Sequence, residues 1–342
     1  MLGAAFKSLV LLFGVAAQLS YGQPSALETR PESAVTATLR LFDTHPVVGI
    51  GEMHDLQELG DFYTDLISQP AFAEDVGNVV FEFGNAFFQP VMNRYLAGED
   101  VPYSEVQKAW TTMVGTKGSD EISVMYGQFY EAVREANWTL PEGEKIKVWL
   151  GDPSTDPNDP LAYTGERFPD RDAFFANIVL REILARGEKA LLVIGAGHFV
   201  DDVVDDGLMA NTATVFECKY RVPYTYNVRA CIDAYYPNKL FLIQNHWGLA
   251  DPLCNRQLET RLELGPVPSL TPLRDTSLAT FLDSPKCKAE NWWGTLTSAW
   301  SDAYLYLGKS DELTLSPLPG KPEMPYLKTL LRDVPGMKEP NR

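Results

Sequence analysis

The chain has 342 residues, of which 45% are hydrophobic and 22% are charged, a composition typical of a globular protein with a sizeable core. Its formal net charge of −17 argues against nucleic acid as a partner, because nucleic-acid recognition needs a basic surface. The sequence shows no internal repeat and no low-complexity tract, so a solenoid or a disordered linker protein is not indicated.

The first 22 residues have the features of a secretory signal peptide. Lys7 supplies the positive charge, residues 9–17 form a short apolar stretch, and Ser20 and Gly22 are small residues at the −3 and −1 positions of a cleavage site. The apolar stretch is shorter than the roughly 20 residues of a membrane span. We therefore predict that residues 1–22 are removed, that the mature chain has no membrane span, and that the protein is secreted or periplasmic. An uncleaved anchor is the alternative.

Beyond the signal peptide, continuous apolar runs alternate with stretches of helical periodicity. The runs are typical of buried β-strands and lie at 47–50, 79–83, 146–150, 190–194 and 240–244. This alternation predicts an α/β fold with a mainly parallel central sheet and helices on both faces. The first four runs are expected to be neighbouring strands.

The pattern weakens in the last hundred residues, which are richer in proline. We predict one α/β domain over residues 23–250. Residues 251–342 are predicted to form a less regular C-terminal extension that packs on the same domain, with a late strand at 303–307.

All four cysteines lie in the second half of the chain, and none is in a Cys-x-x-Cys pair. An even number of cysteines in an exported protein predicts two disulfides. Because neighbouring cysteines close the smaller loops, we predict the pairs Cys218–Cys231 and Cys254–Cys287. Four buried free thiols are the alternative.

Two Gly-x-x-His tetrapeptides, at 51–54 and 195–198, each follow a predicted strand, although the chain has only four histidines. Catalytic groups collect at the carboxyl ends of parallel strands. Glu52 and His54 are two residues apart, so they point to the same side if the strand stays extended. Glu52, His54 and His198 are therefore predicted to act in acid–base chemistry or as metal ligands. Helix capping and core hydrogen bonds are the alternatives.

Glu82 interrupts an apolar strand, where an ionised carboxylate is costly unless it is paired or bound to a cation. We predict that Glu82 joins the catalytic group, with an internal ion pair to Arg94 as the alternative. Arg94, Asp152 and His246 are predicted to bind substrate, since Asp152 and His246 each follow a predicted strand. A turn role for Asp152 and a loop role for His246 are the alternatives.

These motifs resemble the superfamily that unites ChaN-like haem-binding lipoproteins, erythromycin esterases and Tiki/TraB proteins. The resemblance covers roughly residues 45–250 and is carried by Gly51-Glu52-x-His54, by Phe81-Glu82-Phe83 and by Gly195-x-x-His198. It implies that Glu52, His54, Glu82 and His198 occupy the active-site positions of that superfamily. The chain departs from the ChaN-like lipoproteins because no cysteine for lipid attachment follows its apolar stretch.

Members of this superfamily differ in what they do, so the resemblance supports three hypotheses. The main one is an exported hydrolase that acts on a small ester or a peptide-like substrate. In its metal version, His54, His198 and one of Glu52 or Glu82, with Glu52 preferred, hold zinc or manganese, which activates a water. In its metal-free version, His54 deprotonates the water and the backbone of residues 195–197 helps to hold an oxyanion. The alternatives are a haem- or small-ligand-binding protein without turnover and an interaction protein with a decayed site.

Overall fold

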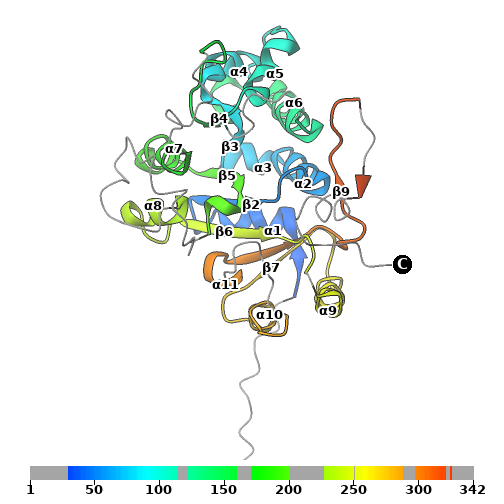
Figure 1. Cartoon of the computed structure of the whole chain (residues 1–342). Coiled ribbons are helices and arrows are strands. Elements are labelled where there is room, and N and C mark those ends of the chain that lie inside the picture. The colour runs from blue at the N-terminus through cyan, green and yellow to red at the C-terminus, as the bar shows by residue number, and fades with distance from the viewer. Residues whose placement is uncertain are drawn as a thin grey trace, which may run out of the picture.

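An eight-stranded sheet forms the centre of the part of the chain that the structure describes (Figure 1). The structure is a computed structural model and describes residues 30–114, 122–159, 171–200, 227–249, 251–287, 297–320 and 324–325. In order across the sheet, the strands are β1 (Glu32–Ser33), β7 (Ser269–Pro272), β8 (Ala303–Tyr306), β6 (Leu240–Asn245), β2 (Val47–Glu52), β5 (Ala190–Gly195), β3 (Asn78–Asn85) and β4 (Lys147–Asp152). A separate pairing joins β9 (Thr314–Leu315) to β10 (Met324–Pro325).

The neighbouring strands from β8 to β4 are all parallel. At the middle of the sheet, Val47 of β2 lies between Ala190 of β5 and Leu240 of β6. Every residue of β2, β3 and β5 is buried, as expected for parallel strands covered on both faces. The predicted α/β fold class is confirmed, and the four runs predicted as neighbouring strands are β2, β3, β4 and β5.

Helices cover the two faces in groups that follow chain order (Figure 1). One face carries α1 (Ala34–Leu41), α2 (Gln57–Ile67), α3 (Pro70–Asp75), α4 (Gln89–Leu96), α5 (Tyr103–Thr111) and α6 (Val124–Trp138). The other carries α7 (Arg171–Ile178), α8 (Val228–Tyr235) and α11 (Thr297–Trp300), while α9 (Pro252–Leu262) and α10 (Ser277–Leu282) pack against β8. The short helical turns are η1 (Ala86–Phe88), η2 (Glu142–Glu144), η4 (Val179–Ile183), η5 (Leu184–Arg186) and η6 (Ala196–His198).

Helix α6 buries one side against β3, because Tyr126, Phe129, Tyr130 and Val133 recur at helical spacing. The ring centroid of Phe129 lies 4.2 Å from that of Phe81 in β3. This packing sets the first turn of α6, which carries Tyr126, beside the carboxyl ends of β2 and β3.

The chain beyond residue 250 contributes two strands, β7 and β8, to the same sheet. It then returns to the start of α2, where the backbone N–H of Thr314 donates to Glu58 at 3.0 Å and the N–H of Ser316 donates to the Asp55 carbonyl at 2.7 Å. The division into residues 23–250 and 251–342 stays a prediction.

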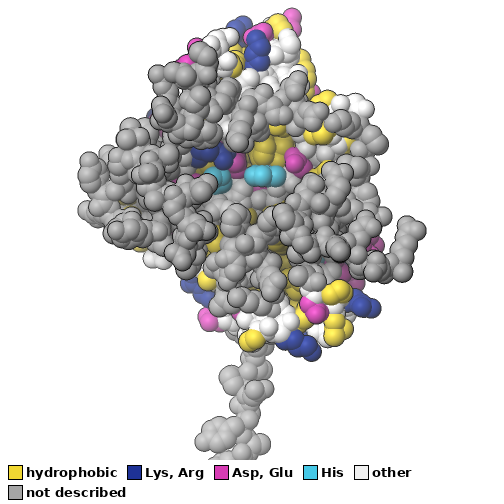
Figure 2. Space-filling model, in the orientation of Figure 1, with side chains coloured by type: hydrophobic (Ala, Val, Ile, Leu, Met, Phe, Trp, Pro, Cys, Tyr) yellow, Lys and Arg dark blue, Asp and Glu magenta, His cyan; other side chains and the backbone are white. Residues whose placement is uncertain are grey.

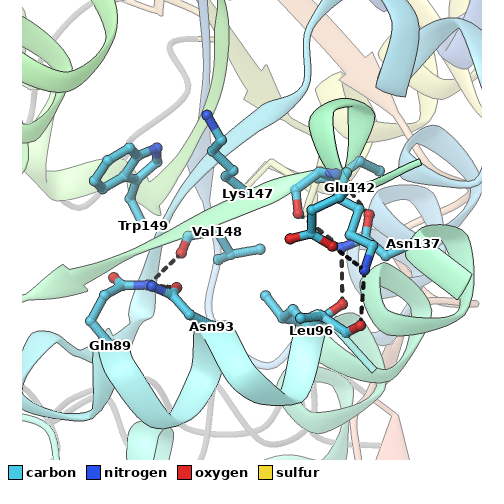
Figure 3. Close-up of a pocket in the computed structure, with 11 residues that line it drawn as sticks. Gln89, Asn93, Leu96, Asn137, Glu142, Lys147, Val148 and Trp149 are labelled. Atoms are coloured by element: carbon cyan, nitrogen blue, oxygen red, sulfur yellow. Dashed lines mark hydrogen bonds and ion pairs between the residues drawn. The ribbon is translucent and has the colours of Figure 1, made fainter. Parts of the chain in front are cut away.

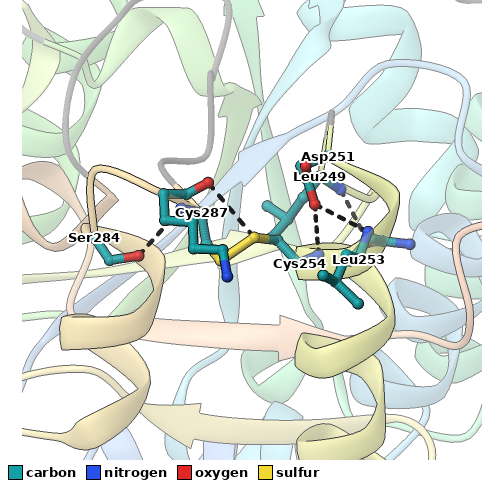
Figure 4. The surroundings of a disulfide bond; sticks show 8 residues. Leu249, Asp251, Leu253, Cys254, Ser284 and Cys287 are labelled. Carbon is teal, nitrogen blue, oxygen red and sulfur yellow. Dashed lines mark hydrogen bonds between the residues drawn. A yellow bond between two sulfur atoms is a disulfide. The ribbon is translucent and has the colours of Figure 1, made fainter.

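A disulfide joins Cys254 in α9 to Cys287 (Figure 4), which confirms one of the two predicted pairs. Asp251 caps the same helix, since its side chain accepts the backbone N–H groups of Leu253 and Cys254. Cys218 lies outside the described residues, so its pairing with Cys231 stays a prediction.

Residues 1–29 also lie outside the described residues, and the signal peptide at 1–22 therefore stays a prediction. Among the helices that are described, none has the length and apolar character needed to cross a membrane. The disulfide is the feature of the described fold that fits an oxidising compartment.

Candidate functional site

Acidic and imidazole side chains gather at the carboxyl end of the parallel sheet. Glu52 ends β2, Glu82 lies within β3, Asp152 ends β4, and His198 ends η6 directly after β5. His54 follows β2 by two residues. Because the strands are parallel, these positions share one edge of the sheet. Histidine, basic and acidic side chains are seen together in the middle of the face that Figure 2 shows.

Arg171, the first residue of α7, joins two of the carboxylates. Its Nη2 donates to Glu82 Oε1 at 2.6 Å, and its Nε donates to Asp152 Oδ1 at 2.8 Å. Burial would raise the pKa of Glu82, but the charge of Arg171 and those of the two histidines lower it well below its usual value. Glu82 is therefore ionised, and its partner is Arg171.

The second oxygen of Glu82 holds the end of β5. Oε2 accepts the backbone N–H of Gly195 at 2.5 Å. That N–H is therefore engaged and does not point at a reacting group. The expectation that the backbone of residues 195–197 helps to hold an oxyanion is therefore wrong for the Gly195 N–H and stays a prediction for the other two residues.

His198 lies between two carboxylates. Its Nδ1 is hydrogen-bonded to Asp172 in α7, and its Nε2 lies 3.6 Å from Glu82 Oε1. Its ring meets that of Phe175 edge-on, with the centroids 5.0 Å apart. Burial would lower the pKa of His198, but the charges of Asp172 and Glu82 raise it to about 9. The raised pKa favours the imidazolium form of His198, in which both ring nitrogens are donors.

His54 is the more exposed of the two histidines, with 48% of its side chain accessible. Its Nδ1 lies 3.9 Å from Glu52 Oε1, and its ring meets that of Phe83 edge-on. A Cβ added to Gly195 would lie 3.1 Å from His54 Nε2 and 3.2 Å from Glu82 Oε2, so the His54 ring packs over Gly195 next to Glu82. Partial removal from water would lower the pKa of His54, but the negative charges of Glu82 and Glu52 raise it to about 9.

Glu52 is buried and is oriented by Tyr126. The Tyr126 hydroxyl donates to Glu52 Oε1 at 3.0 Å and accepts the backbone N–H of Asp55 at 3.1 Å, while its ring stacks on Phe83. Glu52 Oε2 is buried and accepts no hydrogen bond from the residues that the structure describes. Burial raises the pKa of Glu52. Glu52 is therefore placed to orient the His54 ring from its buried side, where a substrate does not reach.

The side chains brought together do not fit a divalent metal ion. In the described ranges, no group of three His, Cys, Asp or Glu side chains is arranged to hold one. Both oxygens of Glu82 already accept hydrogen bonds, and Arg171 places a positive charge where the cation would bind. The described side chains therefore give no support to the predicted metal ligation by His54, His198 and Glu52.

Two residues predicted to bind substrate lie elsewhere. Arg94 is on the exposed side of α4, where its Nε donates to Glu99 at 2.7 Å. His246 is fully buried, with Nδ1 2.9 Å from the Tyr304 hydroxyl and Nε2 3.3 Å from Glu259. Because burial lowers the pKa of His246, it is neutral and acts as a core hydrogen-bonding group. The structure brings neither residue to the site.

Sequence reasoning assigned no role to Arg171, Asp172 or Tyr126. A buried Glu82 signals that some cation must lie nearby, but it does not say which one. Asp172 stands in the first turn of a helix, where an acid is usually a surface feature that favours the helix dipole. Tyr126 lies on an apolar helix face, which is typical of a core position.

A cavity of about 280 Å³ lies at the free edge of β4, at the other end of that strand from the acidic cluster (Figure 3). There the side-chain amide of Gln89 donates to the Val148 carbonyl and accepts the Leu150 N–H, both at 2.8 Å. Asn137 pairs in the same way with both backbone groups of Ile146. These amides take the place of a further strand and protect the edge of the sheet. The cavity is part of this edge and not of the candidate site.

Comparison with known proteins identifies no family, since no family model and no curated protein matches the chain. Among solved structures, the chain is similar to the type III effector HopBA1, with 16% identity and a TM-score of 0.36 over 67% of this chain and 91% of that one. It is also similar to ChaN of Campylobacter jejuni, solved with cofacially bound heme, with 10% identity and a TM-score of 0.35 over 63% of this chain and 87% of that one. Likenesses this low do not extend a function to the chain.

Proposed function

We propose that the protein is a hydrolase that cleaves an ester or peptide-like bond, with His54 as its general base. The observation that supports this most is the position of His54, which is half exposed at the carboxyl end of the sheet while Glu52 and Glu82 lie buried beside it. A histidine oriented by a carboxylate is a common arrangement for taking a proton from water. The resemblance to erythromycin esterases and Tiki proteins belongs to the same proposal.

The side chains of the site have separate roles in this mechanism. His54 takes the proton of the attacking water, and we assign this step to Nε2 because Nδ1 faces Glu52. Glu52, held by Tyr126, orients the ring and stabilises the imidazolium that forms. Glu82 and Gly195 form the wall against which the ring packs, so they are positioning residues.

Activity on chromogenic substrates tests the function directly. The purified protein is expected to hydrolyse neutral 4-nitrophenyl esters or peptide 4-nitroanilides. Because the site does not fit a metal ion, the rate is expected to survive treatment with a chelator. A rate lost on chelation and restored by zinc or manganese contradicts the metal-free mechanism.

The rate is expected to rise with pH and to level off above about 9. His54 accepts a proton only when it is neutral, and in the free protein its pKa is raised, so protonation holds the base inactive at lower pH. Because kcat/KM reports groups of the free enzyme, the measurement is the pH profile of kcat/KM for a neutral ester. A profile that falls through the same range means that His54 acts as an acid.

Gly195→Ala is expected to reduce activity on the order of 10²-fold, because the new Cβ would lie only 2.9 Å from His54 Cε1 and would displace the ring. Gly143→Ala is the matched control, since a Cβ there meets nothing within 4 Å. Both variants are assayed for kcat/KM and for the midpoint of thermal unfolding. Equal activity of the two variants contradicts the placement of His54 over Gly195.

Export of the protein is part of the proposal. The disulfide Cys254–Cys287 supports it, because structural disulfides persist in oxidising compartments. N-terminal sequencing of the protein recovered outside the cytoplasm, with cleavage after Gly22, is the expected result.

Haem binding without turnover is the second candidate function. One observation favours it: the half-exposed His54 has its Nδ1 turned to a buried carboxylate, and such a contact orients histidine ligands in metalloproteins. Addition of haem with an absorption scan separates the two functions. A Soret band that disappears in His54→Ala, with no ester hydrolysis by the wild-type protein, would replace the hydrolase proposal.

A further inference from the structure

We propose that Arg171 and His198 form a binding site for an oxyanion, so that the substrate of this site carries a carboxylate, phosphate or sulfate group next to the bond that is cleaved. This inference rests on the proposed function for the location of the cleaved bond. The binding of the anion itself can be measured without any activity.

The negative and positive side chains of the site differ in how exposed they are. The carboxylates lie at the back, where the side chains of Glu52 and Asp152 are fully buried and that of Glu82 is 4% exposed. The cationic side chains lie in front, where Arg171 is 20% exposed and His198 is 18% exposed. Within the described part of the site, the positively charged donors are thus more exposed than these three carboxylates, although the whole chain has a net charge of −17.

Two of these donors stand side by side. Arg171 Nη1 lies 3.4 Å from His198 Nε2, at the long end of the hydrogen-bonding range. The other nitrogens of both groups have carboxylate partners: Nε and Nη2 of Arg171 donate to Asp152 and Glu82, and Nδ1 of His198 is hydrogen-bonded to Asp172. An oxyanion placed across Nη1 and Nε2 would accept a hydrogen bond from each nitrogen when His198 is protonated, in place of the long contact between them.

The pair is also close to the proposed base. Glu82 Oε1 binds Arg171 and lies 3.6 Å from His198, while Glu82 Oε2 is on the side where His54 packs over Gly195. An anionic group held by the pair would thus set the neighbouring bond of the substrate near His54. Binding energy from this group would orient the substrate for attack by water.

The test uses the ring nitrogens of the four histidines as probes in the full-length mature protein. Inorganic phosphate and, in a parallel series, acetate are titrated at constant ionic strength while long-range ¹H–¹⁵N spectra are recorded. The ring ¹⁵N signals of His198 and His54 are expected to shift and to saturate as the anion is added. The ring signals of His45 and His246 are expected to stay unchanged. Tighter binding of phosphate indicates a tetrahedral oxyanion, and tighter binding of acetate indicates a carboxylate.

Two variants test whether Arg171 and His198 themselves bind the anion. Arg171→Lys and His198→Gln are each expected to weaken phosphate binding about tenfold or more, because each removes one charge-assisted hydrogen bond. If Arg171→Lys fails to fold, His198→Gln carries the test alone. Arg94→Gln is the control, since Arg94 pairs with Glu99 on the exposed side of α4.

The outcomes separate this inference from the proposed function. If no ring ¹⁵N signal shifts, or if the signals of all four histidines shift together, the oxyanion site is overturned, even if His54-dependent hydrolysis of neutral esters is found. Saturable binding that needs Arg171 and His198, without hydrolysis of any ester or anilide, supports the oxyanion site and overturns the hydrolase.

Discussion

His54→Gln is expected to reduce the rate of hydrolysis about 10²–10⁴-fold, the range that general base catalysis contributes. Glutamine keeps hydrogen-bonding capacity and similar volume but cannot take a proton from water. Because the His54 side chain is half exposed, the midpoint of thermal unfolding is expected to change little. The measurement is kcat/KM on a neutral ester together with thermal unfolding of both proteins.

His45→Gln is the control for this variant. The ring of His45 bonds to Thr44 and packs on Phe241, before β2 begins, so it is on the same stretch of chain but at the opposite end of the strand. Its activity is expected to equal that of the wild-type protein. A fully active His54→Gln variant would remove His54 from the mechanism, whatever its effect on stability.

Arg171→Met is expected to lower the free energy of unfolding by about 3–5 kcal/mol, because it leaves the buried carboxylates of Glu82 and Asp152 without their shared cation. Methionine keeps most of the side-chain volume, so the effect is electrostatic rather than a cavity. The measurement is chemical denaturation at neutral pH.

The control is Arg94→Met, which removes an exposed ion pair with Glu99 and is expected to cost about 0–1 kcal/mol. The double variant Arg171→Met, Glu82→Gln is expected to recover part of the lost free energy of unfolding, since it also removes one of the two unpaired buried carboxylates. If Arg171→Met and Arg94→Met are equally stable, Arg171 does not hold the carboxylates together.

The sheet and the strand-end position of the site were predictable because both follow from local sequence. Continuous apolar runs indicate strands buried on both faces, and parallel strands bring residues such as Glu52 and Glu82 to one edge. The ionic partners were not predictable, because they depend on contacts between distant segments. Arg171 is 89 residues from Glu82, whereas Arg94 is closer in sequence but points away from the sheet.

Tyr126, which orients Glu52, could not be predicted for the same reason. It occupies a helix position that any buried aromatic residue would fill. Only the packing of α6 on β3 brings its hydroxyl to Glu52, which is 74 residues away in the sequence. His246 shows the reverse case. It directly follows β6, as a site residue would, but the neighbouring α9 and β8 enclose it.

His54 and His198 belong to one site because the negative charge of Glu82 acts on both rings. The direct measurement is the NMR titration of both imidazoles in the wild-type protein and in Glu82→Gln. In the wild-type protein, both pKa values are expected near 9. Removing the negative charge is expected to lower both together, since the neutral ring is then less disfavoured. A His54 pKa that is ordinary in the wild-type protein, or unchanged in the variant, would show that Glu82 does not join the two histidines in one site.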